Sequence, residues 1–347
     1  MTENGQPDTI LRALPKAELH LHLEGSIRPD TAVELAARHG GKFTPEEVTA
    51  RYSYSNFAGF LDTFKWVTSF LRDPEDYVLI TKNLAAELVR QNIVYAEVTV
   101  SAGVMLRRMQ NVEKNFTAIR ETAESAPFSR LRIAWIFDAV RQFGPDAAME
   151  TARWAARLRG SGIVAFGMGG DELSHPTVNF RPAFDFARSE GLHTVCHAGE
   201  IGGPESVREA IALLGAERIG HGIAVMRDPE LAKSLAARRI VLENCLTSNL
   251  ATGALAKQTG NPNASLADHP LPKFLEQGLS VTLSTDDPAL FHTDLCAEYS
   301  HAASLGLSNQ QLLRLAGESF AAAFLPPVEK RELLSRFQDA AKSAGLL

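Results

Sequence analysis

The feature that most constrains the fold is a regular alternation of short apolar segments with segments of helical periodicity. Eight segments have the length and composition of buried strands, most are followed by a helical segment, and no hairpin signal separates them. The strands are expected at 16–23, 93–100, 131–140, 162–168, 193–197, 218–220, 240–244 and 280–284. This alternation is typical of a parallel α/β sheet and predicts a (β/α)8 TIM-type barrel, with a doubly wound open sheet as the alternative.

Two further helical segments lie outside the strand–helix alternation, and no linker separates either of them from it. We therefore expect one domain over residues 1–347. Residues 40–75 contain many aromatic residues at largely helical spacing, which indicates either a helical lid over the carboxyl-end face or a plain core-facing helix. Residues 307–347 are expected to form terminal helices.

Composition excludes several classes of function. The net charge is −6 and no basic run occurs, which argues against a nucleic-acid partner. No stretch approaches about 20 apolar residues, so no membrane span is expected, and residues 1–8 lack a signal pattern. Three scattered cysteines are typical of a reducing cytoplasm. We expect a cytoplasmic protein that is a monomer or a small homo-oligomer with a small-molecule partner.

Polar residues interrupt the apolar strands mainly at their carboxyl ends, where a parallel barrel assembles its active site. His20 and His22 lie two apart on the first strand, so both imidazoles face the same side. The other positions are Gly170 to Glu172 after the fourth strand, His197 and Glu200 after the fifth, His221 after the sixth, and Asp286 and Asp287 after the eighth.

Three neutral imidazoles and one carboxylate suit a single Zn²⁺ ion, which predicts His20, His22, His197 and Asp286 as metal ligands. A zinc ion activates a bound water molecule near neutral pH. Glu200 lies three residues beyond His197 and is a candidate general acid. His221 would orient that water or stabilise its charge, and Asp287 would accept a hydrogen bond from a protonated ring nitrogen. Gly170 would let a flat heterocycle approach its backbone closely.

Six motifs together resemble the adenosine/adenine deaminase family, in the family's order, from about residue 14 to residue 295. They are LHLHLEGS at 19–26, GDE at 170–172, HAGE at 197–200, RIGHG at 218–222, CLTSN at 245–249 and STDDP at 284–288. The resemblance implies a zinc-dependent barrel with one zinc ion per chain that replaces the 6-amino group of a purine by oxygen. It implies zinc binding by the four ligands named above, and that Glu200 protonates N1, His221 serves the attacking hydroxide, Asp287 holds N7 and Gly170 holds N3.

Two departures from the family pattern concern the substrate. Glu24 stands where adenosine deaminases usually have an aspartate that contacts the ribose 5′-hydroxyl, and adenine deaminases also have glutamate there. Residues 167–169 lack the carboxylate that many adenosine deaminases carry just before the glycine that holds N3. We therefore expect the substrate to be adenosine or an adenosine-like nucleoside such as 6-aminodeoxyfutalosine, with free adenine as the alternative. Another metal-dependent amidohydrolase activity is a further alternative, but the two-metal kind is disfavoured because no lysine ends the fourth strand.

Residues around the sugar end are expected to select the substrate. Phe60 and Phe64 would form the aromatic lid. Arg141 after the third strand, or Arg107 and Arg108 after the second, would bind the aromatic carboxylate of 6-aminodeoxyfutalosine. Among the remaining histidines, His269 is expected at the surface or as a helix cap, His193 is expected to be buried in its strand, and His292 is expected in a loop on the catalytic face. For Glu172 a structural role in binding loop backbone and a functional role both remain open.

Overall fold

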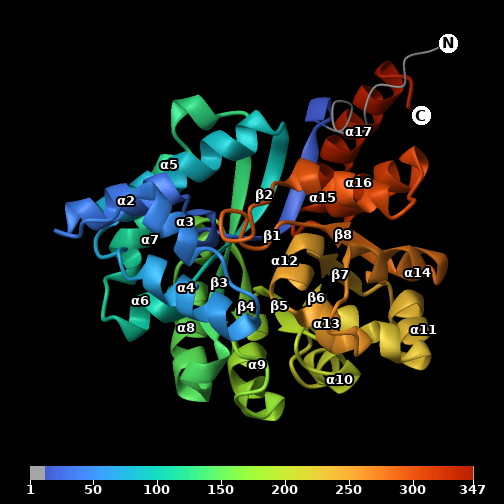
Figure 1. The fold of residues 1–347 in the computed structure, drawn as a ribbon, viewed down its shortest axis with the longest axis horizontal. Coiled ribbons are helices and arrows are strands. Elements are labelled where there is room, and N and C mark those ends of the chain that lie inside the picture. Colours follow the sequence, from blue (N-terminus) through green and yellow to red (C-terminus); the bar gives the residue numbers. More distant parts are fainter. Residues whose placement is uncertain (1–11, 347) are drawn as a thin grey trace.

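The computed structural model describes residues 12–346, in which eight parallel strands form a barrel with consecutive strands as neighbours (Figure 1). The strands are β1 (Lys16–His22), β2 (Ile93–Val100), β3 (Arg132–Val140), β4 (Ile163–Gly169), β5 (His193–Ala198), β6 (Arg218–His221), β7 (Val241–Asn244) and β8 (Ser280–Leu283). The predicted barrel is confirmed and the open-sheet alternative is wrong. The absence of a signal in residues 1–8 and the ends of the predicted domain lie outside the described residues.

The last and first strands meet just beyond the end of β8. One parallel bridge joins Leu21 to Asp286. The His22 N–H donates to the Asp286 carbonyl at 2.8 Å, and the Asp286 N–H donates to the His20 carbonyl at 3.0 Å. The backbone that closes the barrel therefore belongs to three of the predicted metal ligands.

Helices surround the barrel and connect its strands. They are α2 (Pro29–Arg38), α3 (Pro45–Arg51), α4 (Phe57–Thr68), α5 (Pro74–Arg90), α6 (Ala102–Arg107), α7 (Val112–Ala123), α8 (Pro145–Arg157), α9 (Arg181–Ser189), α10 (Pro204–Leu213), α11 (Pro229–Arg238), α12 (Leu246–Ala251), α13 (Ala254–Thr259), α14 (Leu271–Glu276), α15 (Leu295–Ser304), α16 (Asn309–Ala322) and α17 (Pro327–Ser343). Short 3-10 helices include η1 (Glu24–Ser26) after β1. Within residues 12–346 no helix is long and apolar enough to cross a membrane.

The aromatic segment predicted at 40–75 forms α3 and α4, and α4 lies across β3 and β4 in Figure 1. Its aromatic residues divide between the two predicted roles. Phe60 stacks on Phe291 with ring centroids 5.0 Å apart and lines the cavity described below. Trp66 instead packs edge-on against Phe70 at 5.0 Å, away from that cavity. The segment is thus both a cover for the site and part of the core.

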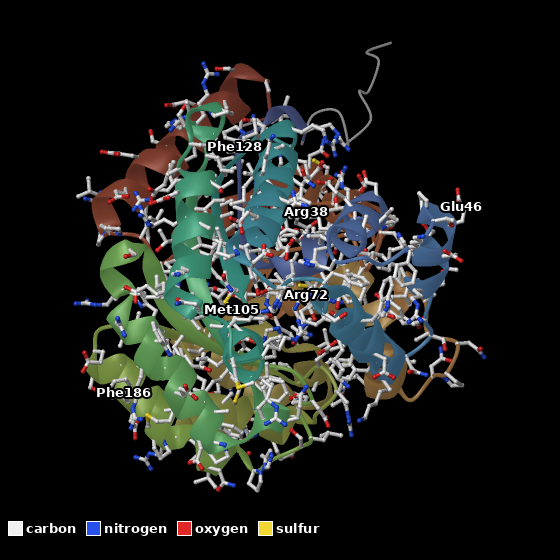
Figure 2. All side chains as sticks on the ribbon, turned by 90° about the vertical axis from the view of Figure 1, so that its left-hand side faces the viewer. Arg38, Glu46, Arg72, Met105, Phe128 and Phe186 are labelled. Carbon is white, nitrogen blue, oxygen red and sulfur yellow. The ribbon has the colours of Figure 1, made fainter. Side chains whose placement is uncertain are left out.

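The C-terminal helices complete the outer layer. α16 packs on β1 and β8, and α17 packs on α16 through Phe320 and Phe337 at 5.7 Å. Figure 2 shows the outer helices from the side, with Glu46 of α3 at the edge of the molecule and Met105 of α6 further in. Met105 is fully buried, so the short helix after β2 is anchored to the barrel.

Candidate active site

Ring nitrogens of three histidines and one carboxylate oxygen converge at the carboxyl end of the barrel. His20 Nε2 and His22 Nε2 lie 3.2 and 3.3 Å from Asp286 Oδ1, and His22 Nε2 lies 3.3 Å from His197 Nε2. Tetrahedral zinc with bonds of about 2.0–2.1 Å separates neighbouring ligand atoms by about 3.3 Å. These three distances are close to that value. In this cluster, two groups of described residues could hold a metal ion with all ligand atoms within 4.8 Å of one another: His20, His197, His221 and Asp286, and separately His22, Asp286 and Asp287.

The protonation of this cluster also suits a bound cation. Burial lowers the pKa of His22 to about 4 and the pKa of His197 well below its usual range, so both are neutral at neutral pH. Burial alone would lower the pKa of His20, but hydrogen bonds with Asp286 and Glu243 outweigh it and raise the pKa to about 10. His20 Nε2 is buried and faces the Asp286 carboxylate as an ion pair at 3.2 Å. A metal ion would replace the proton at that atom.

A buried ionic chain holds His20 from behind, and the sequence analysis did not find it. Glu243 on β7 contacts His20 Nδ1 through Oε2 at 2.9 Å and accepts from Arg218 Nε through Oε1 at 2.6 Å. Arg218 also bonds to Glu97 on β2. A carboxylate on the second nitrogen of a metal-binding histidine fixes the orientation of the ring and increases its basicity.

The pKa values of the neighbouring residues Asp286 and Asp287 are shifted in opposite directions. Burial alone would raise the pKa of Asp286, but its hydrogen bond with His20 and the neighbouring imidazoles hold that pKa well below its usual range. Burial and the charge of Asp286 raise the pKa of Asp287 well above its usual range. A Cβ atom on Gly25 would lie 1.8 Å from Asp287 Oδ1, so only glycine leaves room for that carboxyl.

Glu200 follows β5 on a loop that Glu172 holds in place. The Glu172 carboxylate accepts hydrogen bonds from the backbone N–H groups of residues 199–202 and from the Ser206 hydroxyl. Glu172 therefore has the structural role that the sequence left open. Burial and the charge of Asp286 raise the pKa of Glu200 well above its usual range, which favours the protonated carboxyl.

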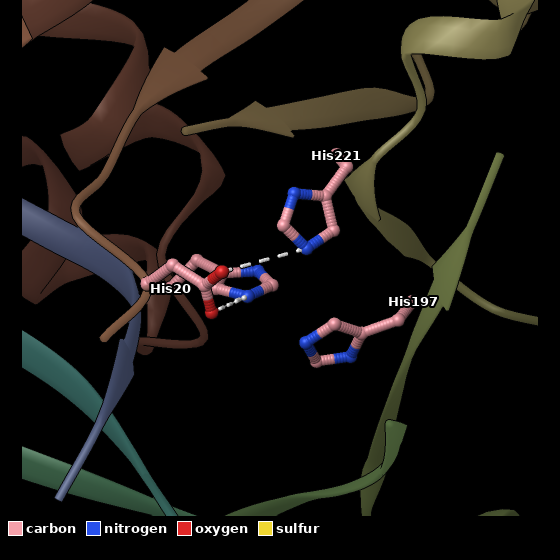
Figure 3. A group of neighbouring side chains, drawn as sticks. His20, His197 and His221 are labelled. Carbon is pink, nitrogen blue, oxygen red and sulfur yellow. Dashed lines mark ion pairs between the residues drawn. The ribbon is translucent and has the colours of Figure 1, made fainter. Parts of the chain in front are cut away.

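His221 ends β6 with a left-handed backbone (φ 61°), and Asp286 has a similar conformation (φ 65°). Such positions in non-glycine residues are typical of functional sites. Figure 3 shows His221 directing one ring nitrogen toward Asp286. That nitrogen, Nε2, lies 3.7 Å from Glu200 Oε2 and 3.8 Å from Asp286 Oδ2. Burial lowers the pKa of His221 to about 3, so the ring is neutral.

A cavity of about 310 Å³ opens beside this cluster. Its inner wall includes Glu200, His221, Asp287 and Gly170, and Phe57, Phe60 and Phe64 of α4 form an aromatic outer wall. Arg107 and Phe143 also line it, with the guanidinium 5.6 Å from the ring centroid. A larger cavity of about 620 Å³ lies between the barrel and α2, α5 and α15, and none of the four metal-ligand candidates lines it.

The structure corrects the placement of Arg141. Arg141 is 2% exposed and does not line the site cavity. It donates to the His175 carbonyl and to Thr177, and its guanidinium lies over the Phe180 ring at 5.5 Å. The side chain holds the loop after β4 rather than facing a substrate.

Glu24 is next to the site but is not part of the cavity wall. Its Oε1 accepts from the Ser101 N–H at 3.0 Å, while its Oε2 has no partner among residues 12–346. Burial raises the pKa of Glu24 to about 7. Ser101 does line the cavity, so Glu24 lies directly behind the cavity wall and holds its backbone.

The remaining histidine predictions have different outcomes. The prediction of a surface position for His269 is wrong, because His269 is 4% exposed and bonds to Asn249 at 3.2 Å, although its ring does accept from the Leu271 N–H at the start of α14. The prediction that His193 is buried is wrong, because it is exposed at the start of β5, where it stacks on Phe324 at 4.1 Å. His292 lies in the loop after β8, as predicted, and lines the larger cavity rather than the site cavity.

Asp138 on β3 is a further buried carboxyl in the cavity wall. Its carboxyl occupies the space above two glycines of β4, because a Cβ atom on Gly167 or Gly169 would lie 2.8 or 3.0 Å from it. Burial raises the pKa of Asp138 to about 8. The glycines of β4 are therefore explained by a carboxyl from the neighbouring strand.

The fold and the site together define a metal-dependent hydrolase built on a (β/α)8 barrel. A family model described as adenosine deaminase matches residues 15–340. The chain is 42% identical over 324 residues to an aminodeoxyfutalosine deaminase from Streptomyces coelicolor, which covers 91% of this chain and 81% of the relative. It is 34% identical over 325 residues to an adenine deaminase from Rhizobium leguminosarum bv. trifolii, covering 93% and 98% of the two chains.

A solved structure agrees with this likeness. The crystal structure of an adenine deaminase from Arthrobacter aurescens has a TM-score of 0.88 and 27% identity, covering 95% of this chain and 100% of that chain. The chain belongs to the adenosine deaminase family. It is a hydrolytic purine deaminase, and the resemblance seen in the sequence is confirmed.

Proposed function

We propose that this chain binds one zinc ion through His20, His22, His197 and Asp286 and deaminates an adenine nucleoside of the 6-aminodeoxyfutalosine type. The spacing of the four ligand atoms supports zinc, which when bound supplies an activated water molecule. The remaining residues of the site bind the purine and move protons.

Glu200 is the proton donor. Its raised pKa favours the protonated carboxyl, and donation to purine N1 makes C6 electron-poor and open to water. Burial and the charge of Asp286 also raise the pKa of Asp287, and its protonated carboxyl would donate to N7, because N7 of an adenine nucleoside has a lone pair and no hydrogen. This role as donor replaces the acceptor role expected from the sequence.

The purine lies flat against the end of β4. Gly170 has φ +92°, a conformation that disfavours side chains, and its N–H would donate to N3. A Cβ atom there would also lie 2.3 Å from Gln142 Oε1. The glycine is thus required both by the backbone and by the Gln142 side chain that packs against it.

One observation carries the choice of substrate: Arg107 is a cation at the cavity wall whose guanidinium has no carboxylate partner in the described part of the chain. By contrast, Arg108 donates to the carbonyls of Thr68 and Lys65, and Arg141 is turned away. A guanidinium beside an aromatic wall suits a substituent that is both aromatic and anionic. The Streptomyces coelicolor relative named aminodeoxyfutalosine deaminase supports the same substrate.

The experiment compares kcat/KM for ammonia release from 6-aminodeoxyfutalosine, adenosine and adenine by the zinc-loaded enzyme. We expect the first to be preferred. Arg107→Ala should lower kcat/KM for 6-aminodeoxyfutalosine by roughly 10–100-fold, the value of a charge-assisted hydrogen bond, and leave adenosine nearly unchanged. Arg336→Ala, an exposed arginine on α17, is the matched control. If Arg107→Ala lowered kcat/KM equally for 6-aminodeoxyfutalosine and adenosine, Arg107 would not recognise the substituent that distinguishes them.

Free adenine is the second candidate. It is favoured by the relatives named adenine deaminase and by the glutamate at position 24, whose Oε2 has no hydrogen-bond partner among residues 12–346. A preference for adenine over both nucleosides in the same assay would establish it. The wall formed by Phe60 and Phe64 would then close an empty sugar site.

A further inference from the structure

The ring nitrogen of His221 that faces away from the metal-ligand cluster is held by a chain of three buried side-chain and backbone contacts. Asn249 Nδ2 lies 3.0 Å from His221 Nδ1, and His269 Nε2 lies 3.2 Å from Asn249 Oδ1. The Leu271 backbone N–H donates to His269 Nδ1 at 3.2 Å. His221, Asn249 and His269 are each at most 4% exposed, so water does not replace these contacts.

The direction of this chain is fixed at its far end, because a backbone N–H can only donate. His269 Nδ1 must therefore be an acceptor, which leaves the proton of the neutral ring on Nε2. That proton points to Asn249 Oδ1, so the Asn249 amide presents its NH2 group to His221. His221 Nδ1 must in turn be an acceptor, and the proton of neutral His221 lies on Nε2.

We infer that Asn249 and His269 are positioning residues that fix His221 as the Nε2–H tautomer, so that His221 meets the reacting water as a hydrogen-bond donor and not as a general base. Figure 3 shows His221 with Nε2 directed toward Asp286 and its other nitrogen turned away from the cluster. The gaps of 3.7 and 3.8 Å to Glu200 and Asp286 are too long for direct hydrogen bonds and leave an oxygen-sized space between the three groups.

The opposite tautomer would reverse every donor in the chain. With the proton on His221 Nδ1, the Asn249 amide must turn over and His269 must carry its proton on Nδ1, facing the Leu271 N–H. A buried N–H left facing another donor is disfavoured about tenfold or more. The only unprotonated nitrogen of His221 is thus enclosed by Asn249, out of reach of a water proton. Glu200 is the group left to exchange protons with the substrate.

Nitrogen-15 NMR of histidine-labelled, zinc-loaded protein tests this inference without substrate, so the result does not depend on which purine is deaminated. The ring of His221, assigned by comparison with His221→Gln, should show a protonated Nε2 and an unprotonated Nδ1. A proton on Nδ1 would overturn the inference. Because the wild-type protein is measured, the test does not depend on the folding of any variant.

Asn249→Asp supplies a second test. A carboxylate at position 249 accepts from both rings, so the proton of His221 should move to Nδ1, with kcat reduced about tenfold or more and KM changed less than threefold. Asn115→Asp is the matched control, because Asn115 is also buried and donates to Gln110, but on α7 outside the site. An unchanged His221 tautomer in folded Asn249→Asp would show that Asn249 does not set it.

Discussion

Replacing Glu172 by glutamine tests how the loop that carries Glu200 is held. In the wild-type protein one carboxylate oxygen accepts from the Gly199 N–H and the other from the N–H groups of residues 200–202. Glutamine has the same shape but only one acceptor oxygen. Its NH2 group must therefore face at least one backbone donor, whichever way the amide is turned.

The cost follows from these contacts. The better orientation keeps the amide oxygen on the three N–H groups and leaves the Gly199 N–H facing a donor, at about 1–3 kcal/mol. The three remaining hydrogen bonds lose their charge, at about 1 kcal/mol each. The free energy of unfolding should therefore fall by about 4–6 kcal/mol, which lowers Tm by roughly 5–8 °C. Since Glu200 loses its fixed position, kcat should also fall by about tenfold or more.

Thermal unfolding and ammonia release measured on the same zinc-loaded samples decide the matter. Asp171→Asn is the matched control, because the neighbouring Asp171 is half-buried and its carboxylate accepts only from the Leu173 N–H. If Glu172→Gln unfolded within about 2 °C of the wild type and kept its kcat, the loop would not depend on this carboxylate.

Two further predictions concern the groups around the metal ligands. The pKa of Glu200 is raised, which favours the protonated carboxyl. Because a proton donor is active only below its pKa, kcat/KM should fall as the pH rises through the pKa of Glu200. Glu200→Gln should lower kcat about 10²–10⁴-fold and leave the zinc content unchanged. The decrease of kcat/KM at high pH should also disappear in this variant. If the decrease persists, a group other than Glu200 causes it. Glu243→Gln should weaken zinc binding about 10–100-fold in competition with a chelator, because His20 loses a charged partner. If the zinc affinity of Glu243→Gln were unchanged, Glu243 would stabilise the fold but would not support the metal ligand.

The sequence predicted the barrel and the residues of its carboxyl end because both depend on short-range patterns. Strand periodicity placed His20 and His22 on one face, and parallel strands bring their carboxyl ends together without further information. The pattern did not predict where a long side chain turns after the strand ends. Arg141 was expected in the cavity, but packing on Phe180 and two hydrogen bonds turn it into the adjoining loop.

The supporting groups were missed for a different reason. Glu97 and Arg218 are 121 residues apart, and a single sequence gives no sign that they meet. His269 follows a polar segment and precedes a proline, a context typical of surface residues, yet α14 returns it to the interior. Such pairs are fixed by the tertiary packing of elements whose own sequences are ordinary.

The closure of the barrel through Asp286 has a consequence for how the enzyme matures. His20 and the bonded Ser284 are 264 residues apart, so the first ligands leave the ribosome long before the last one is synthesised. A nascent chain lacking β8 and Asp286 would offer the proposed zinc ion only imidazoles, and its first strand would have no neighbour on one side. Binding of that ion and pairing of the first strand with the residues after β8 would then coincide, which would tie the onset of activity to the synthesis of the last strand.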